Sequence, residues 1–98
     1  MLESAYQNKL IKKLARLFPD SFILKNDSAY MQGVPDLLIL VGTKWAMLEV
    51  KPRATAGEQP NQRFYVETLN AMSFSAFIYP ENEEEVLDAL QQLFSSER

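Results

Sequence analysis

Cysteine and histidine are both absent from the 98-residue sequence, and each absence excludes a class of site. Without cysteine there is no disulfide framework and no thiolate metal site. Without histidine there is no Ser-His or Cys-His catalytic triad, no histidine general base and no histidine zinc site. Catalysis by this chain would therefore have to use carboxylates, lysine, hydroxyl groups or a metal bound through oxygen, for which Mg²⁺ or Mn²⁺ is best suited.

Long apolar segments are missing as well. No stretch reaches the roughly 18 apolar residues of a membrane-spanning helix, and no signal peptide is recognisable. We therefore expect a soluble, cytoplasmic chain with no membrane partner. The length predicts one domain, residues 1–98, with a single core and little room for a separate specificity domain.

Positive charge is scarce overall but unevenly distributed. The net charge is −3, yet residues 1–66 carry nine basic against six acidic side chains, and the remainder carries one against seven. A helical projection places four basic residues in one arc beside an apolar arc: Lys9, Lys12, Lys13 and Arg16. This basic stripe is either a phosphate-binding surface or an ordinary solvated helix face. Lys25, Arg53 and Arg63 mark an alternative path for nucleic acid.

Two apolar runs of strand length, residues 37–41 and 45–50, flank Gly42-Thr43. A glycine in the first loop position favours a type II′ hairpin turn. Such a hairpin places Asp36 directly opposite Glu49, with Cβ atoms about 4.5–5.5 Å apart, and Lys51 on the same face. Because both runs are nearly all apolar, we expect a sheet covered on both faces, with the two acids at the edge of a buried surface. Carboxylates this close repel one another unless a proton or cation intervenes, and a hard divalent cation is the natural partner.

The remaining chain predicts an α/β domain in the order α-β-β-β-α-β-α. A helix over residues 2–18 stops before Pro19, and a short strand covers residues 22–24. A second helix begins near Pro60, a favoured first-turn position, and packs through Tyr65, Val66, Leu69 and Met72. A strand over residues 74–79 and a closing amphipathic helix, with its apolar face between residues 86 and 94, complete the fold. Glu81, Glu83, Glu84 and Glu85 lie at the start of that last helix and would complement its dipole.

Glu3 and Gln62 project onto helix faces where apolar residues are expected. The structural alternative is that each side chain caps its helix N-terminus or belongs to a frayed first turn. Near a pair of metal-binding carboxylates they are instead candidates for a third acidic ligand and for an amide that orients water or phosphate.

Residues 33–36, Gly-Val-Pro-Asp, and residues 49–51, Glu-Val-Lys, resemble the two motif halves of the PD-(D/E)XK nuclease superfamily. Glu3 in the first helix and a glutamine at the start of the second narrow the resemblance to the VRR-NUC family. Its small stand-alone members occur in phages and bacteria and are similar to Holliday-junction resolvases. The motif glutamine is placed at Gln62, with Gln59 as the alternative. The resemblance covers nearly the whole chain and implies a restriction-endonuclease-like core, with a central mixed sheet flanked by helices.

The resemblance also implies metal-dependent phosphodiester hydrolysis. Asp36, Glu49 and the Val50 carbonyl would bind Mg²⁺ or Mn²⁺, and Glu3 would complete the metal shell or bind a second ion. Lys51 would stabilise developing negative charge or position the attacking water, and Gln62 would orient water or phosphate. The structural alternative for Asp36, Glu49 and Lys51 is a cross-strand ion pair.

The same resemblance implies that the partner is branched DNA, such as a Holliday junction, in the cytoplasm of a bacterial cell or a phage-infected host. Arg53 and Arg63 would add to the basic stripe as DNA contacts. Symmetric cleavage of a four-way junction needs two active sites, which predicts a homodimer. Trp45, Phe74 and Phe77 are candidates for its interface or belong to the core. The alternative function is a non-catalytic DNA- or protein-binding module on the same fold.

Overall fold

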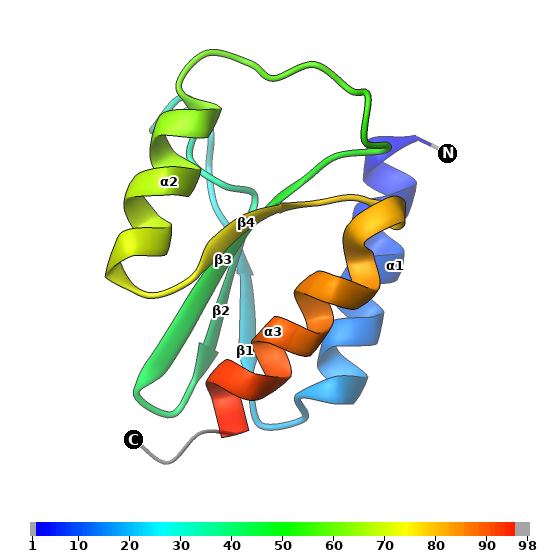
Figure 1. Ribbon diagram of the computed structural model, residues 1–98, viewed down its shortest axis with the longest axis vertical. Coiled ribbons are helices and arrows are strands. Elements are labelled where there is room, and N and C mark those ends of the chain that lie inside the picture. The colour runs from blue at the N-terminus through cyan, green and yellow to red at the C-terminus, as the bar shows by residue number, and fades with distance from the viewer. Residues whose placement is uncertain (1, 96–98) are drawn as a thin grey trace.

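The computed structural model describes residues 2–95. The elements follow the predicted order, with a short 3-10 turn before the last helix (Figure 1). They are α1 (Glu3–Leu17), β1 (Phe22–Lys25), β2 (Leu37–Val41), β3 (Lys44–Val50), α2 (Gln62–Met72), β4 (Ser75–Ile78), η1 (Pro80–Asn82) and α3 (Glu83–Ser95). In this part of the chain no helix combines the length and the apolar character needed to cross a bilayer. The α/β class is confirmed.

Strands β2 and β3 form the predicted hairpin. Val41 pairs with Lys44 and Leu37 with Leu48, the register expected from a two-residue loop at Gly42-Thr43. Gly42 has a φ of +61° whereas Thr43 does not enter the positive region, which is the pattern of a type II′ turn. One step beyond the last paired residues, the same register sets Asp36 against Glu49.

The sheet has the order β1-β2-β3-β4. The first three strands are antiparallel neighbours, and β4 runs parallel to β3. A parallel neighbour requires a crossover connection, which α2 supplies. The predicted mixed sheet flanked by helices is confirmed.

Helices α1 and α3 cover one face of the sheet, and α2 lies on the other (Figure 1). The core lies between the sheet and the α1–α3 pair, where alternate residues of β2 and β3 are completely buried. Its fully inaccessible members are Leu14, Leu37, Ile39, Ala46, Leu48, Val50, Ile78 and Leu90. This packing fixes the strand ends that carry the polar motifs.

The second face of the sheet is only partly covered, so the expectation of two covered faces was wrong at β1. Helix α2 packs against β3 and β4. On β1, Phe22 is 70% and Leu24 47% exposed. Their pairing partners Leu40 and Leu38 lie on the same face of the sheet. An apolar run predicts strand structure equally well whether one or both of its faces are packed.

Two details of α2 also differ from expectation. The helix begins at Gln62 rather than near Pro60, because Asn61 adopts a left-handed conformation with a φ of +72° and Pro60 belongs to the preceding turn. Met72, expected on the packed face, is 68% exposed. Of the aromatic interface candidates, Phe74 packs against the core, whereas the ring of Phe77 lies under the Arg63 guanidinium.

Candidate active site

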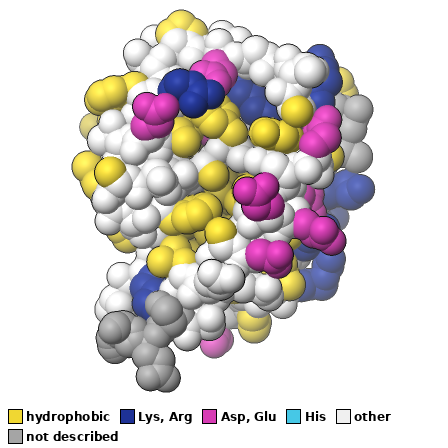
Figure 2. Space-filling view, viewed as in Figure 1, with side chains coloured by type: hydrophobic (Ala, Val, Ile, Leu, Met, Phe, Trp, Pro, Cys, Tyr) yellow, Lys and Arg dark blue, Asp and Glu magenta, His cyan; other side chains and the backbone are white. Residues whose placement is uncertain are grey.

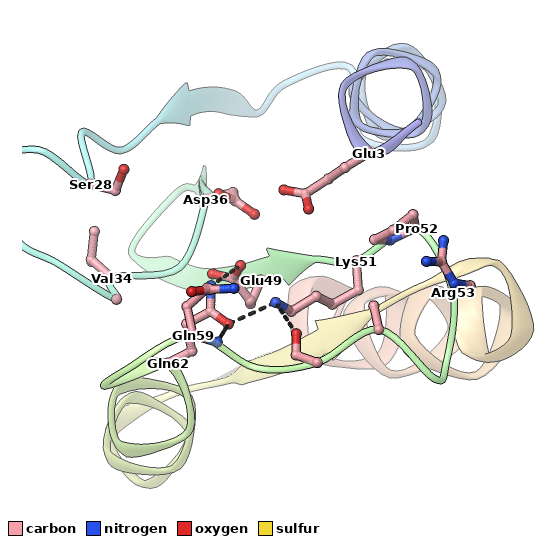
Figure 3. A pocket seen from close by; sticks show the side chains of 13 residues that line it. Glu3, Ser28, Val34, Asp36, Glu49, Lys51, Pro52, Arg53, Gln59 and Gln62 are labelled. Atoms are coloured by element: carbon pink, nitrogen blue, oxygen red, sulfur yellow. Dashed lines mark hydrogen bonds between the residues drawn. The ribbon is translucent and has the colours of Figure 1, made fainter. Parts of the chain in front are cut away.

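A cavity of about 420 Å³ opens at the end of the sheet where β2 begins and β3 ends. The N-terminus of α1, the loop before β2, the end of β3 and the start of α2 all contribute to its wall. The polar side chains that line it converge in Figure 3: Glu3, Asp36, Glu49, Lys51 and Gln62. All five residues predicted to form the catalytic centre are therefore brought to one cavity.

The carboxylates of Asp36 and Glu49 occupy different environments within this cavity. Asp36 Oδ2 accepts a hydrogen bond of 2.9 Å from the backbone N–H of Val50, which ties the side chain across the hairpin. Glu49 is only 2% exposed. Its Oε2 accepts a hydrogen bond from Gln62, and its Oε1 is buried with no hydrogen-bond partner among the described residues. A buried carboxylate oxygen without a partner is costly.

Burial is the main cause that raises the pKa of Glu49, from an ordinary 4.5 to about 8, and the neighbouring Asp36 raises it further. Lys51 opposes this shift and does not cancel it. Burial, together with Asp36, also raises the pKa of Glu3. At neutral pH, without a cation, Glu49 therefore holds a proton, and an ionised pair would require an added positive charge.

Lys51 is buried and bonded to the segment that leads into α2. Its Nζ donates to the Gln62 Oε1, at 2.7 Å, and to the Gly57 carbonyl, at 3.0 Å. The Gln62 Nε2 donates to Glu49 Oε2, at 2.9 Å (Figure 3). Since an ammonium group can only donate, these contacts fix the orientation of the Gln62 amide. Gln62 thus links the lysine to the buried glutamate, and no direct ion pair joins the two.

The structure distinguishes the two candidate glutamines. Gln62 places its side chain between Lys51 and Glu49. Gln59 contributes its backbone N–H, which donates to Gln62 Oε1 at 2.8 Å. Sequence reasoning missed the two backbone groups, the Gln59 N–H and the Gly57 carbonyl, because no side-chain pattern marks a main-chain ligand.

Gly33, the first residue of the Gly-Val-Pro-Asp segment, has a packing role. Its φ is +92°, and a Cβ placed on it would lie 2.6 Å from the Asn61 Cβ and 2.7 Å from the Pro60 carbonyl oxygen. Asn61 Nδ2 also donates to the Gln32 carbonyl. The loop that leads to Asp36 thus packs tightly against the turn that leads to Gln62, and only glycine fits both the space and the backbone conformation.

The donor set fits a hard divalent cation: carboxylate oxygens, one of them buried and unpartnered, with no competing nitrogen or sulfur ligand. Within residues 2–95, however, no three acidic side chains are close enough to form a ready-made metal cluster. Glu3 points from α1 toward Asp36 in Figure 3. The predicted third carboxylate therefore faces the pair across the cavity, and its role as a ligand stays a prediction.

The predicted DNA contacts lie in two regions. Arg53 lines the active-site cavity. Arg63 bonds Glu58 and Glu67 on the surface, and it lines a second, smaller cavity together with Arg53 and Lys51. The basic stripe of α1 borders the acidic start of α3, where Lys13 bonds Glu83; Figure 2 shows acidic side chains over α3, with basic ones at the edge behind them. Arg53 and Arg63 thus lie with Lys51, whereas the basic stripe of α1 lines a different cavity.

Comparison with solved structures finds the same fold in another protein. A solved structure of a VRR_NUC domain protein superposes with a TM-score of 0.71 over 95% of this chain and 88% of its own, at 19% sequence identity. No family model matches the sequence, and no curated protein matches it. The chain therefore has the fold of a VRR_NUC domain protein.

Proposed function

We propose that this protein is a metal-dependent DNA endonuclease that hydrolyses phosphodiester bonds and prefers branched DNA. The observation that carries the proposal is the buried Glu49 beside Asp36, with one carboxylate oxygen unpartnered and Lys51 held nearby by Gln62. A cross-strand ion pair, the structural alternative, would bring Lys51 onto a carboxylate, whereas the Lys51 Nζ donates its hydrogen bonds to Gln62 and Gly57. The shared fold with a VRR_NUC domain protein supports a nuclease.

In this proposal Asp36, Glu49 and the Val50 carbonyl hold Mg²⁺ or Mn²⁺, with Glu3 as a further ligand. The Val50 N–H bonds the Asp36 carboxylate, so the backbone at Val50 lies next to another of the proposed ligands. A divalent cation at such a site polarises a phosphoryl oxygen and lowers the pKa of bound water. Because the pKa of Glu49 is raised to about 8, a cation held there would displace its proton, so metal binding should release protons.

Lys51 then stabilises negative charge that develops on the phosphate. An ammonium group has three donors, and the bonds to Gln62 and Gly57 engage two of them. The third can face a phosphate oxygen or the attacking water. Because Gln62 and the Gly57 carbonyl hold the lysine in place beforehand, little reorganisation is needed when charge develops.

The preference for branched DNA is proposed from the resemblance to Holliday-junction resolvases, and the small size of the domain is compatible with it. A chain this small has few elements with which to read base edges, so it would recognise backbone and DNA shape. Arg53, at the cavity, is the basic residue best placed to contact the phosphates next to the bond that is cut. Lys9, Lys12, Lys13, Arg16 and Arg63 would contact phosphates farther away.

We also propose a two-fold homodimer through the uncovered face of the sheet. The residues exposed there, Phe22 and Leu24, and their paired neighbours Leu40 and Leu38 are all apolar and uncharged. A symmetric cut in a four-way junction requires two copies of the active site, and an isologous contact through one uncharged face supplies them. Sedimentation equilibrium tests this: wild type should dimerise, and Phe22→Glu should be monomeric.

The function is tested by a cleavage panel of four-way junction, flap, splayed-arm, linear and single-stranded DNA with Mg²⁺ or Mn²⁺. We expect the four-way junction to be cut fastest, and chelation or Asp36→Asn to stop cleavage. Tight binding of DNA with no metal-dependent cleavage would favour the alternative, a binding module that does not use its metal site. Equal cleavage of all substrates would remove the preference for branched DNA.

A further inference from the structure

Asn26 contacts both peptide groups that flank the α-carbon of Asp36. Its backbone N–H donates to the Asp36 carbonyl, at 2.8 Å, and so continues the β1–β2 pairing one step beyond Lys25 and Leu37. Its side-chain Nδ2 donates to the Pro35 carbonyl, also at 2.8 Å. One residue thus fixes the orientation of the peptide before Asp36 and of the peptide after it.

These contacts determine the direction in which the Asp36 side chain leaves the backbone. Pro35 is fully buried and its ring fixes its own φ, so the chain enters Asp36 from a rigid neighbour. Asn26 then holds the two flanking peptides from the β1 side, and the Val50 N–H holds the carboxylate from the β3 side. The Asp36 carboxylate is therefore positioned from both neighbouring strands.

We propose that Asn26 is a positioning residue of the active site, which sets the Asp36 carboxylate relative to Glu49. This inference rests on the proposed function for its link to catalysis, but the positioning itself is independent of cleavage. Nothing in the sequence marks Asn26, because an asparagine that follows a strand and precedes Asp27-Ser28 is typical of a turn. If Asn26 served only to end β1, its replacement would leave the position of the Asp36 carboxylate unchanged.

The amide is the chemical group that this position requires. Alanine leaves the Pro35 carbonyl without its side-chain donor. Aspartate has the same shape but places an acceptor against that carbonyl and adds negative charge beside Asp36 and Glu49. Asn26→Asp should therefore be worse than Asn26→Ala for the site, although it conserves side-chain volume.

The test uses the full chain and two measurements that need no DNA cleavage. The Val50 amide proton, which bonds the Asp36 carboxylate, is followed by NMR, and Mg²⁺ and Mn²⁺ affinity is measured by calorimetry without DNA. We expect Asn26→Ala to shift the Val50 amide proton upfield and to weaken metal binding by about 10–100-fold, the range typical of residues that orient a ligand. The single-turnover cleavage rate should fall in parallel.

Asn70→Ala is the matched control, since the Asn70 side chain accepts a hydrogen bond from the Ser75 N–H at the other end of the sheet. It should leave the Val50 resonance and metal affinity unchanged. A folded Asn26→Ala protein with wild-type Val50 resonance and wild-type metal affinity would overturn the inference. If Asn26→Ala does not fold, the isosteric Asn26→Asp is judged by the same two readouts.

If neither variant folds, the inference is tested by NMR on the wild-type protein titrated with metal. Metal binding should shift the Asn26 side-chain amide resonances, and unshifted resonances would contradict the inference. A wild-type protein that cleaves no DNA would defeat the proposed function, yet the Val50 readout would still report whether Asn26 positions Asp36. The two failures are therefore distinguishable.

Discussion

Two glutamates in this molecule, Glu49 at the end of the sheet and Glu83 at the start of α3, have opposite electrostatic environments. Glu49 is buried beside Asp36, and its pKa is raised to about 8. Burial alone would raise the pKa of Glu83 as well, but hydrogen bonds from Lys13 and Tyr6 lower it below its ordinary value. One glutamate has a cation in contact, and the other lies in a cavity where no cation touches it among residues 2–95.

The difference does not come from a shortage of lysine. Lys51 is two residues from Glu49, immediately after the end of β3, and is also buried, yet its Nζ bonds Gln62 and Gly57. At Glu83 the charges neutralise each other, which is how a stabilising contact is built. At Glu49 the chain keeps the carboxyl group and its lysine apart, at a cost in stability, and such costs are characteristic of functional sites.

The largest expected effect comes from removing either carboxylate of the cavity. Asp36→Asn or Glu49→Gln should reduce cleavage by at least about 100-fold, since electrostatic groups aimed at a reacting phosphate typically contribute that much. The fold and much of the DNA affinity should remain. Single-turnover cleavage and a DNA-binding titration measure the two quantities separately.

Glu83→Gln is the matched control for this pair. It removes a carboxylate that Lys13 already neutralises, so cleavage by the folded protein should stay at the wild-type rate while stability falls by about 1 kcal/mol. Full activity in either purified Asp36→Asn or Glu49→Gln would refute the assignment of the metal ligands.

Lys51, near Glu49, and Lys13, bonded to Glu83, extend the comparison of the two glutamates. Lys51→Ala should lower turnover by about 100-fold with metal affinity changed only a few-fold, because its proposed role is with phosphate and water. Lys13→Ala should leave turnover unchanged. Calorimetric metal titration alongside single-turnover kinetics tests this, and a loss of metal binding that accounts for the whole rate defect in Lys51→Ala would contradict it.

The pH dependence of stability should differ in sign between the glutamates. Between pH 4.5 and about 8 the folded, metal-free protein keeps a proton on Glu49 that the unfolded chain has lost, so stability falls as pH rises through this range. For Glu83, whose pKa is lowered, stability is present above pH 4.5 and is lost as pH falls.

At pH 8 without metal, Glu49→Gln should therefore be more stable than wild type by on the order of 3 kcal/mol, and the two should converge near pH 5. Urea unfolding in the presence of a chelator, at several pH values, measures this. Parallel stability profiles for wild type and Glu49→Gln would show that Glu49 does not carry the proton.

Sequence reasoning recovered the contacts that local chemistry determines. The glycine at the first position of a two-residue loop sets the hairpin register, and that register alone opposes Asp36 and Glu49. Gln62 also lines the cavity although its helix starts two residues later than predicted, because the helical period, and not the boundary, decides which face a residue occupies.

What sequence reasoning missed depends on contacts between distant segments. The bond between Lys13 and Glu83 joins residues 70 positions apart, and no local pattern pairs them. The apolar face at β1 is exposed although its sequence predicts a covered one, since an apolar run does not show whether a helix packs there. Gly33 was visible as part of a motif, but its reason, the close approach of Pro60 and Asn61, appears only in three dimensions.

The smallest expected effect concerns the basic stripe of α1. The bond between Lys13 and Glu83 reduces the positive charge that Lys13 presents to DNA, whereas Lys12 keeps its full charge. Each phosphate contact removed should flatten the slope of log affinity against log salt by about 0.7–0.9. Lys12 is exposed, whereas Lys13 is partly neutralised by Glu83, so Lys12→Gln should flatten the slope more than Lys13→Gln. Binding to all DNA forms should weaken similarly, because phosphate contacts do not read sequence.

The free energy of unfolding should also differ between the Lys12→Gln and Lys13→Gln variants. Lys12→Gln should leave the free energy of unfolding unchanged, whereas Lys13→Gln should lose up to about 1 kcal/mol with its partly exposed bond to Glu83. Fluorescence titrations at four salt concentrations and urea unfolding measure the two effects. If neither variant changes the salt slope, the stripe is an ordinary solvated helix face. The DNA would then follow the alternative path along Lys25, Arg53 and Arg63. Of these, Arg53 lines the cavity with Asp36 and Glu49.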